Sequence, residues 1–246
     1  MKRTIFSHFY NEEYLLPFWL KHHRNMFDHG VMVNYASTDA SVDIIRELCP
    51  TWEIHDSKND MFDAKKLQPE MQEYESAHDG WKVVLNTTEF LIANMDILDN
   101  TNADKLIFRA HIMVDSLENM WNEPDPNTPL VESRTNGIDT IDPKNAGFTR
   151  DRGCRLMHRV PNFVYGLGRH YYKETTHDMH VLWYGFSPLT EKMLERKLQI
   201  KSRIPQEDMD SGLGAEHLYT KEKMLQEAER FRSASCDLSY LIKKYR

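Results

Sequence analysis

The chain has 246 residues, of which 40% are hydrophobic and 28% charged, so it can bury one substantial core, and we expect one domain. Its formal net charge of -7 argues against a nucleic-acid partner, because phosphate backbones bind cationic surfaces. The three cysteines form no CxxC pair and fit neither a disulfide framework nor a cysteine metal site. Without a signal-peptide core or a run of about 18 apolar residues, the sequence predicts a soluble, cytoplasmic (intracellular) protein with no transmembrane segment.

The first half of the chain alternates between predicted strands and helices, which indicates βαβ units and an α/β fold with a mostly parallel sheet. Polar turns at residues 11–12, 37–39 and 86–89 each follow a predicted strand. Ligands of such sheets bind at the carboxyl ends of strands, so we expect these turns to share one edge. The expected strands are residues 3–11, 31–35, 52–56 and 81–86. The expected helices are 17–27, 41–48 and 63–78, the last interrupted or restarted at Pro69.

The second half is organised differently. Residues 119–152 are rich in Asn, Asp, Pro and Gly, which predicts long loops over that edge of the sheet. Residues 154–172 and 179–186 are typical of strands. A helix is then expected with Ser187 as its N-cap and Pro188 at its first position, followed by a last amphipathic helix that Thr220 can cap.

Three stretches, "FYNEEYLLPFWLKHHRNMF", "VNYASTDASVDIIREL" and "GWKVVLNTTEFLI", resemble in order and spacing the donor half of GT-A glycosyltransferases of the family-2-like group. "YGLGRHYY" and "MLERKLQIKSRIPQEDMDSGLGAEHL" resemble the C-terminal half of that group. The likeness covers roughly residues 4–230. It implies a GT-A (Rossmann-like) sheet flanked by helices, with C-terminal helices closing the site, in a single domain over 1–246. Residues 1–115 would form the nucleotide-sugar half and 116–246 the acceptor half.

The resemblance implies a hexosyl- or pentosyltransferase that moves a sugar from a nucleotide-diphosphate donor to a hydroxyl of a glycan or glycoconjugate, with inversion. An alternative is a catalytically weak relative that binds a nucleotide sugar or a protein partner. A nucleotidyltransferase shares the sheet plan but usually needs a Gly-rich basic loop after the first strand, which "FYNEEYLLP" lacks.

The stretch "NTTE" departs from the family pattern. In the family, an Asp-x-Asp turn holds Mn²⁺ or Mg²⁺ at the diphosphate, and the two aspartates fall here on Asn86 and Thr88, with Glu89 next. The resemblance therefore implies a divalent-cation site of weakened affinity, with Asn86 and Glu89 as ligands. His180 could replace a family histidine only if the strand register shifts. The alternative is plain helix capping by Thr88.

The resemblance also implies which residues contact the nucleotide sugar. Ser37 or Asp39 could equally cap the following helix, and Arg196 could instead form a buried pair with a carboxylate. His170 and His217 lie beside glycines that allow a ligand to approach the backbone closely. The implied contact residues are Asn11, Glu12, Ser37, Asp39, Asn86, His170, Arg196 and His217.

An inverting transfer needs a carboxylate base for the acceptor hydroxyl. Asp115 follows the strand-like "LIFRAHIMV", so we expect it at the edge of the sheet and take it as the candidate base. The other acids in the region stay open as alternatives, and each could be an ordinary surface acid: Glu118, Glu132, Asp139 and Asp142.

Overall fold

The computed structural model describes residues 1–150, 153–165, 169, 171, 173–211 and 218–245. The strands are β1 Arg3–Phe9, β2 His29–Asn34, β3 Glu53–Asp56, β4 Trp81–Val84, β5 Glu89–Ala93, β6 Lys105–Val114, β7 Asn136–Ile138, β8 Arg155–His158, β9 Met179–Phe186 and β10 Cys236–Asp237. The helices are α1 Leu16–His23, α2 Ser41–Leu48, α3 Ala64–Ser76, α4 Ile97–Asn100, α5 Leu130–Ser133, η1 Pro143–Arg150, α6 Glu191–Leu198, η3 Gln199–Arg203, α7 Gln206–Asp210, α8 Lys221–Arg232 and α9 Ser239–Lys244.

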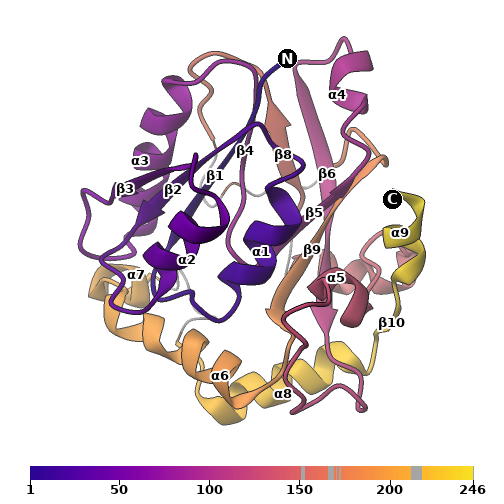
Figure 1. The fold of residues 1–246 in the computed structure, drawn as a ribbon. Helices are drawn as coiled ribbons and strands as arrows, with labels where there is room; N and C mark the ends of the chain where they lie inside the picture. Colours follow the sequence, from indigo (N-terminus) through magenta and orange to yellow (C-terminus); the bar gives the residue numbers. More distant parts are fainter. Residues whose placement is uncertain (151–152, 166–168, 170, 172, 212–217, 246) are drawn as a thin grey trace.

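The strands of the described residues form one mixed sheet with a parallel core (Figure 1). β3, β2, β1 and β4 are neighbours in that order, and all are parallel. β8 lies antiparallel between β4 and β6, and β9 runs parallel to β6 and antiparallel to β5. The predicted α/β fold with a mostly parallel sheet flanked by helices is therefore confirmed.

Helices cover both faces of the parallel core. Ile5 and Phe9 of β1 belong to the same buried cluster as Trp19 of α1, whereas Phe6 of β1 is buried with Met71 of α3. Because alternate residues of a strand face opposite sides, α1 and α3 lie on opposite faces of the sheet. This burial of apolar side chains on both faces is typical of a parallel sheet.

The C-terminal helices pack against the second part of the sheet. Helix α8 buries Phe231 against Ile138 of β7 and Phe186 of β9, and Thr220 caps this helix as predicted, accepting from Lys223 N at 3.2 Å. The predicted start of α6 was wrong. This helix begins at Glu191 and its N-cap is Thr190, whose hydroxyl accepts from Met193 N at 3.3 Å.

The parallel strands all end at one side of the sheet, which we call the carboxyl edge. It is formed by the residues that follow β1, β2, β4, β6 and β9, and Figure 1 shows α6, α7 and α8 along it at the bottom. The opposite side, at which these strands begin, is the amino edge. Among the described residues, no helix has both the length and the apolar character needed to cross a bilayer.

Candidate functional site

Two polar turns of the first half meet at the carboxyl edge. The main-chain N–H of Asn11 donates to Ser37 Oγ at 3.0 Å, and that of Thr38 donates to Asn11 Oδ1 at 2.8 Å. Asn11 has a φ of 49°, in the left-handed region that asparagine adopts more readily than most residues. The structure thus brings the predicted turns into contact, as their positions after parallel strands implied.

Asp39 connects the same two turns through its carboxylate. Oδ2 accepts from the N–H of Glu13 and Oδ1 from that of Ser41, both at 3.0 Å. Ser41 is the first residue of α2, so Asp39 supports the helix start, whereas Ser37 bonds to Asn11 instead. Asp39 and Ser37 are only half-buried, so part of each side chain faces solvent at the edge.

A buried ion pair joins the first turn to α6. Glu12 is 4% exposed and Arg196 is 8% exposed, and the guanidinium contacts both carboxylate oxygens, with Nε 2.6 Å from Oε2. Burial raises the pKa of Glu12, and the neighbouring charge of Arg196 acts in the opposite direction. Of the two roles considered for Arg196, the structure shows the pair with a carboxylate. Gln199 adds a second link, because its Nε2 donates to Asn11 O at 2.9 Å.

Residues 85–88 connect β4 to β5, and no helix begins there, so the capping alternative for Thr88 was wrong. Glu89 is the first residue of β5 and is fully buried. Its Oε1 accepts from Arg155 Nε at 2.9 Å, and its Oε2 accepts from the N–H of Asn86 at 3.0 Å. The charge of this acid is therefore balanced by an arginine of β8.

A second arginine contacts the amide of Asn86. Arg169 Nη2 donates to Asn86 Oδ1 at 3.0 Å. The side chain is 8% exposed, and burial lowers the pKa of its guanidinium. Its Nη1 is buried and has no hydrogen-bond partner among the residues that the structure describes. A protein cation thus lies beside the position where the resemblance implies a metal ion.

The predicted ligand set of Asn86, Glu89 and His180 is not brought together, which corrects that expectation. β5 pairs Glu89 with Trp183 of β9, so His180 lies three residues away along the strand, about 10 Å at the usual rise. His180 Nδ1 faces His111 Nε2 at 3.1 Å instead. The shift of register that His180 would need in order to reach the turn is not present between β5 and β9.

Asp115 follows β6 at the carboxyl edge, as expected, but its carboxylate points into the protein. It is 1% exposed and accepts from Ser187 Oγ at 2.5 Å and from Leu189 N at 2.7 Å. Burial raises the pKa of Asp115, while these hydrogen bonds act to lower it. The contacts join β6 to the segment that leads into α6, and this explains why Ser187 does not cap that helix.

Two aromatic rings and an arginine lie beside the turn that follows β1. The ring of Tyr10 is 6.0 Å from that of Phe62, and the guanidinium of Arg203 lies 4.6 Å from the Tyr10 ring centroid. Arg203 Nη2 donates to Tyr35 O at 2.8 Å, and its Nε is buried without a hydrogen-bond partner in the described part of the chain. Aromatic and guanidinium planes of this kind can stack on a planar ligand.

The sequence interpretation singled out Arg196 but missed Arg155 and Arg169. Arg155 stands in the apolar stretch "CRLMH", where a buried cation needs an acidic partner, and that signal could have identified it. Arg169 lies in "GLGRHYY", beside the histidine that drew attention. The predicted contact residues His170 and His217 lie outside the described residues.

Neither a protein-family model nor a curated protein matches the chain. Two solved structures of S. aureus TarS 1–349 match the chain, each with a TM-score of 0.43. The complex with UDP is 14% identical, and the match covers 82% of this chain and 65% of that chain. The complex with UDP-GlcNAc is 12% identical, and the match covers 82% of this chain and 66% of that chain. A 4-diphosphocytidyl-2C-methyl-D-erythritol synthase also matches (TM-score 0.32, 12% identity, 58% of this chain and 71% of that chain).

The chain thus spans slightly under two thirds of the length of the first two matched structures. With TM-scores below 0.5 and identities of 12–14%, these matches carry no argument beyond the mixed α/β sheet that the structure itself shows.

Proposed function

We propose that the protein is a glycosyltransferase that moves a hexosyl or pentosyl group from a nucleotide-diphosphate sugar to a hydroxyl of a glycan or glycoconjugate, with inversion. The observation that carries this proposal is Arg169 beside Asn86 at the carboxyl edge, with Nη1 lacking a partner in the described part of the chain. A guanidinium binds phosphate oxygens through paired N–H donors. It would therefore neutralise a diphosphate at this position.

The chemistry needs charge stabilisation at the leaving group. When the sugar leaves, the nucleoside diphosphate gains negative charge, and a preorganised cation lowers the barrier to this step. Mn²⁺ and Mg²⁺ need oxygen ligands, preferably charged ones. Of the predicted ligands at this turn, Glu89 has its charge balanced by Arg155, and the amide oxygen of Asn86 already accepts from Arg169. The residues therefore fit a divalent cation poorly, and we assign the diphosphate to Arg169.

The nucleoside would lie toward the first two turns. Tyr10 and Arg203 offer stacking surfaces beside β1, and the half-buried Asp39 offers a carboxylate for base or ribose hydrogen bonds. The hydroxyl of Ser37 already accepts from the main-chain N–H of Asn11. These two residues would therefore shape the pocket by fixing the backbone of the turns.

A second candidate is a protein that binds the nucleotide sugar without transferring it. Two observations favour it: Glu89 is paired with Arg155, and Asp115 is enclosed by Ser187 and Leu189. Both carboxylates are buried, so neither faces solvent, from which an acceptor hydroxyl would approach. Donor binding is common to both candidates, and transfer separates them.

Calorimetric titration with UDP, GDP, CDP, dTDP and their sugars, each with Mn²⁺ and with EDTA, tests the donor site. We expect one nucleotide to bind equally well in both conditions. Arg169→Ala should weaken this binding by about 10- to 100-fold, since hydrogen bonds to charged groups contribute about 1.5–3 kcal/mol. Arg159→Ala is the matched control, because Arg159 pairs with Asp104 near the amino edge.

The following outcomes decide between the candidates. Release of nucleoside diphosphate that depends on an added glycan or glycoconjugate, followed by mass spectrometry, supports transfer. Binding without release supports the second candidate. Binding that EDTA abolishes, or that Arg169→Ala leaves unchanged, contradicts the role given to Arg169, and binding of no nucleotide contradicts both candidates.

A further inference from the structure

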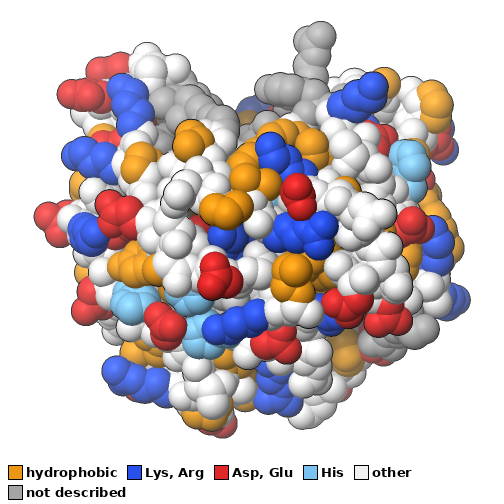
Figure 2. Space-filling view, turned by 90° about the horizontal axis from the view of Figure 1, so that it is seen from above, with side chains coloured by type: hydrophobic (Ala, Val, Ile, Leu, Met, Phe, Trp, Pro, Cys, Tyr) orange, Lys and Arg blue, Asp and Glu red, His pale blue; other side chains and the backbone are white. Residues whose placement is uncertain are grey.

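A histidine cluster lies at the amino edge, away from the candidate donor site. His29 is the first residue of β2, Glu53 is the first residue of β3, and His78 follows the end of α3. Figure 2 views this side of the molecule and shows histidine side chains gathered there among acidic and basic ones. β2 has six residues, so His29 at its start lies about 16 Å from the carboxyl end of the strand at the usual rise per residue. The cluster is therefore separate from the candidate donor site.

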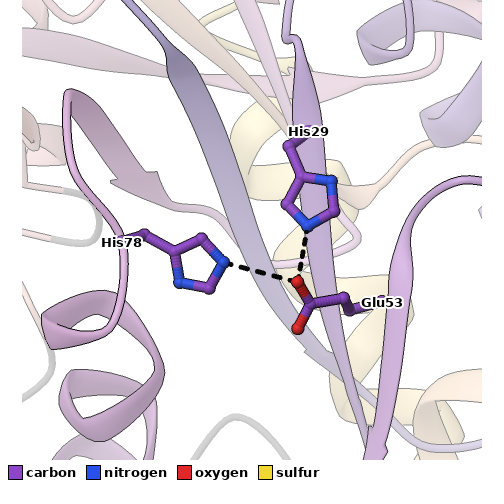
Figure 3. Close-up of side chains that lie close together, drawn as sticks. All are labelled: His29, Glu53 and His78. Carbon is purple, nitrogen blue, oxygen red and sulfur yellow. Dashed lines mark hydrogen bonds and ion pairs between the residues drawn. The ribbon is translucent and has the colours of Figure 1, made fainter.

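The histidine rings converge on a single carboxylate. Figure 3 shows His29 and His78 both pointing toward one oxygen of Glu53. His29 Nε2 lies 2.8 Å from Glu53 Oε1, and His78 Nε2 lies 3.5 Å from the same atom. His55 Nε2 lies 2.8 Å from the other oxygen, Oε2. The ligand atoms of His29, Glu53 and His78 all lie within 4.8 Å of one another.

The hydrogen bond on the far side of His78 sets the role of the nitrogen that faces Glu53. His78 Nδ1 lies 2.8 Å from Tyr74 O, and a carbonyl oxygen can only accept, so Nδ1 carries the hydrogen. In the neutral ring, Nε2 then presents a lone pair to a carboxylate oxygen. This contact is unfavourable without a positive charge between the two atoms. Metal-binding histidines use the same arrangement, with one nitrogen fixed by a carbonyl and the other on the metal.

We propose that His29, Glu53 and His78 form a zinc site, with His55 holding the second oxygen of the carboxylate. Imidazole nitrogens with one carboxylate suit Zn²⁺, whereas Mg²⁺ and Ca²⁺ take oxygen ligands. Two ligands of a tetrahedral zinc ion lie about 3.3–3.5 Å apart. The separation of His78 Nε2 and Glu53 Oε1, 3.5 Å, already meets this geometry.

One contact must lengthen for zinc to enter. His29 Nε2 and Glu53 Oε1 are 2.8 Å apart, about 0.5 Å closer than two ligands of one ion. The Glu53 side chain is 43% exposed, so a small rotation of its carboxyl group can open this space. A bound ion would fasten the end of α3 to the starts of β2 and β3. This role is separate from the proposed transfer.

The test is competition between the EDTA-treated protein and a chromophoric chelator for Zn²⁺. We expect the wild-type chain to bind with a Kd of about 1 µM or below, and His78→Ala and Glu53→Gln to bind about 100-fold more weakly or worse. His177→Ala removes an exposed histidine outside the cluster and should bind like wild type. Zn²⁺, but not Mg²⁺, should raise the melting temperature of the wild-type protein.

Two controls keep the result clear. Melting curves in EDTA show whether each variant is folded. If His78→Ala does not fold, the comparison with wild type uses Glu53→Gln. Co²⁺ should give visible absorption bands with the wild type that both variants lose. The proposal is overturned if the wild type does not compete at about 100 µM, or if folded variants bind Zn²⁺ as tightly as it does.

Discussion

The buried pair of Glu12 and Arg196 makes the sharpest prediction about how the carboxyl edge is held together. The two side chains come from the turn after β1 and from α6, and both are enclosed by the fold. We consider Arg196→Ala, which removes the cation and leaves the carboxylate of Glu12 in place. A hydrogen bond from the Thr87 side chain still acts to lower the pKa of Glu12, but burial raises it more.

The expected loss of stability follows from the burial of the pair. Removing one member of a buried ion pair typically costs about 3–5 kcal/mol, because the remaining charge is uncompensated. In a domain of this size, 1 kcal/mol corresponds to about 2–4 °C in melting temperature, so Arg196→Ala should lower Tm by about 6–20 °C. The exposed pair of Lys221 and Glu191, 43% and 62% accessible, is the matched comparison, and Lys221→Ala should cost at most about 1 kcal/mol.

Urea unfolding of the wild type, Arg196→Met, Glu12→Gln and the double variant gives the coupling energy directly. We expect each single variant to be strongly destabilised and the double variant to lose less than the sum of the two. A coupling energy below about 1 kcal/mol, or an Arg196→Ala loss equal to that of Lys221→Ala, would refute the reasoning.

Two further predictions concern buried titratable groups. Burial holds the pKa of His23 well below its usual value, and the ring is neutral because Nε2 accepts from Leu91 N at 3.1 Å while Nδ1 lies 2.9 Å from Trp19 O. The unfolded state therefore binds the proton first, so stability should fall as pH drops below about 6.5, and His23 alone should account for about 2 kcal/mol of this loss at pH 5. Urea unfolding at pH 7.5 and pH 5 should show this loss, and His23→Gln should reduce it; an unchanged pH dependence in the variant would contradict the assignment. Asp115→Asn should cost about 1–3 kcal/mol of stability through its buried hydrogen bonds and leave donor affinity unchanged. A large loss of turnover with stability intact would instead identify Asp115 as the catalytic base.

Much of the fold could be predicted from local sequence signals. The alternation of strands and helices in the sequence predicted the parallel core. The polar residues that follow the strands predicted turns that meet at one edge, and the hydrogen bond from Asn11 N–H to Ser37 Oγ confirms this contact. The cap at Thr220 was also predictable, because capping depends on neighbouring residues. These features depend on spacing within short segments, which a single sequence displays.

The candidate site was harder to predict, because its contacts join distant segments. Glu89 and Arg155 are 66 positions apart, and Arg169 reaches Asn86 across 83 positions. The register between β5 and β9, which separates Glu89 from His180, depends on packing of the whole sheet. The choice between Ser187 and Thr190 as the cap of α6 likewise depended on Asp115, which draws Ser187 away.

The order of contacts along the chain has a consequence for folding. Arg196 reaches Glu12 across 184 positions, and Gln199 reaches Asn11 across 188. Closing such long loops costs chain entropy before the contacts can form, so we expect the carboxyl edge to be completed late in folding. During synthesis, the turn after β1 is made 184 to 188 residues before these partners. The turn residues proposed to shape the donor pocket are thus made well before the partners in α6 and η3 that fix their position.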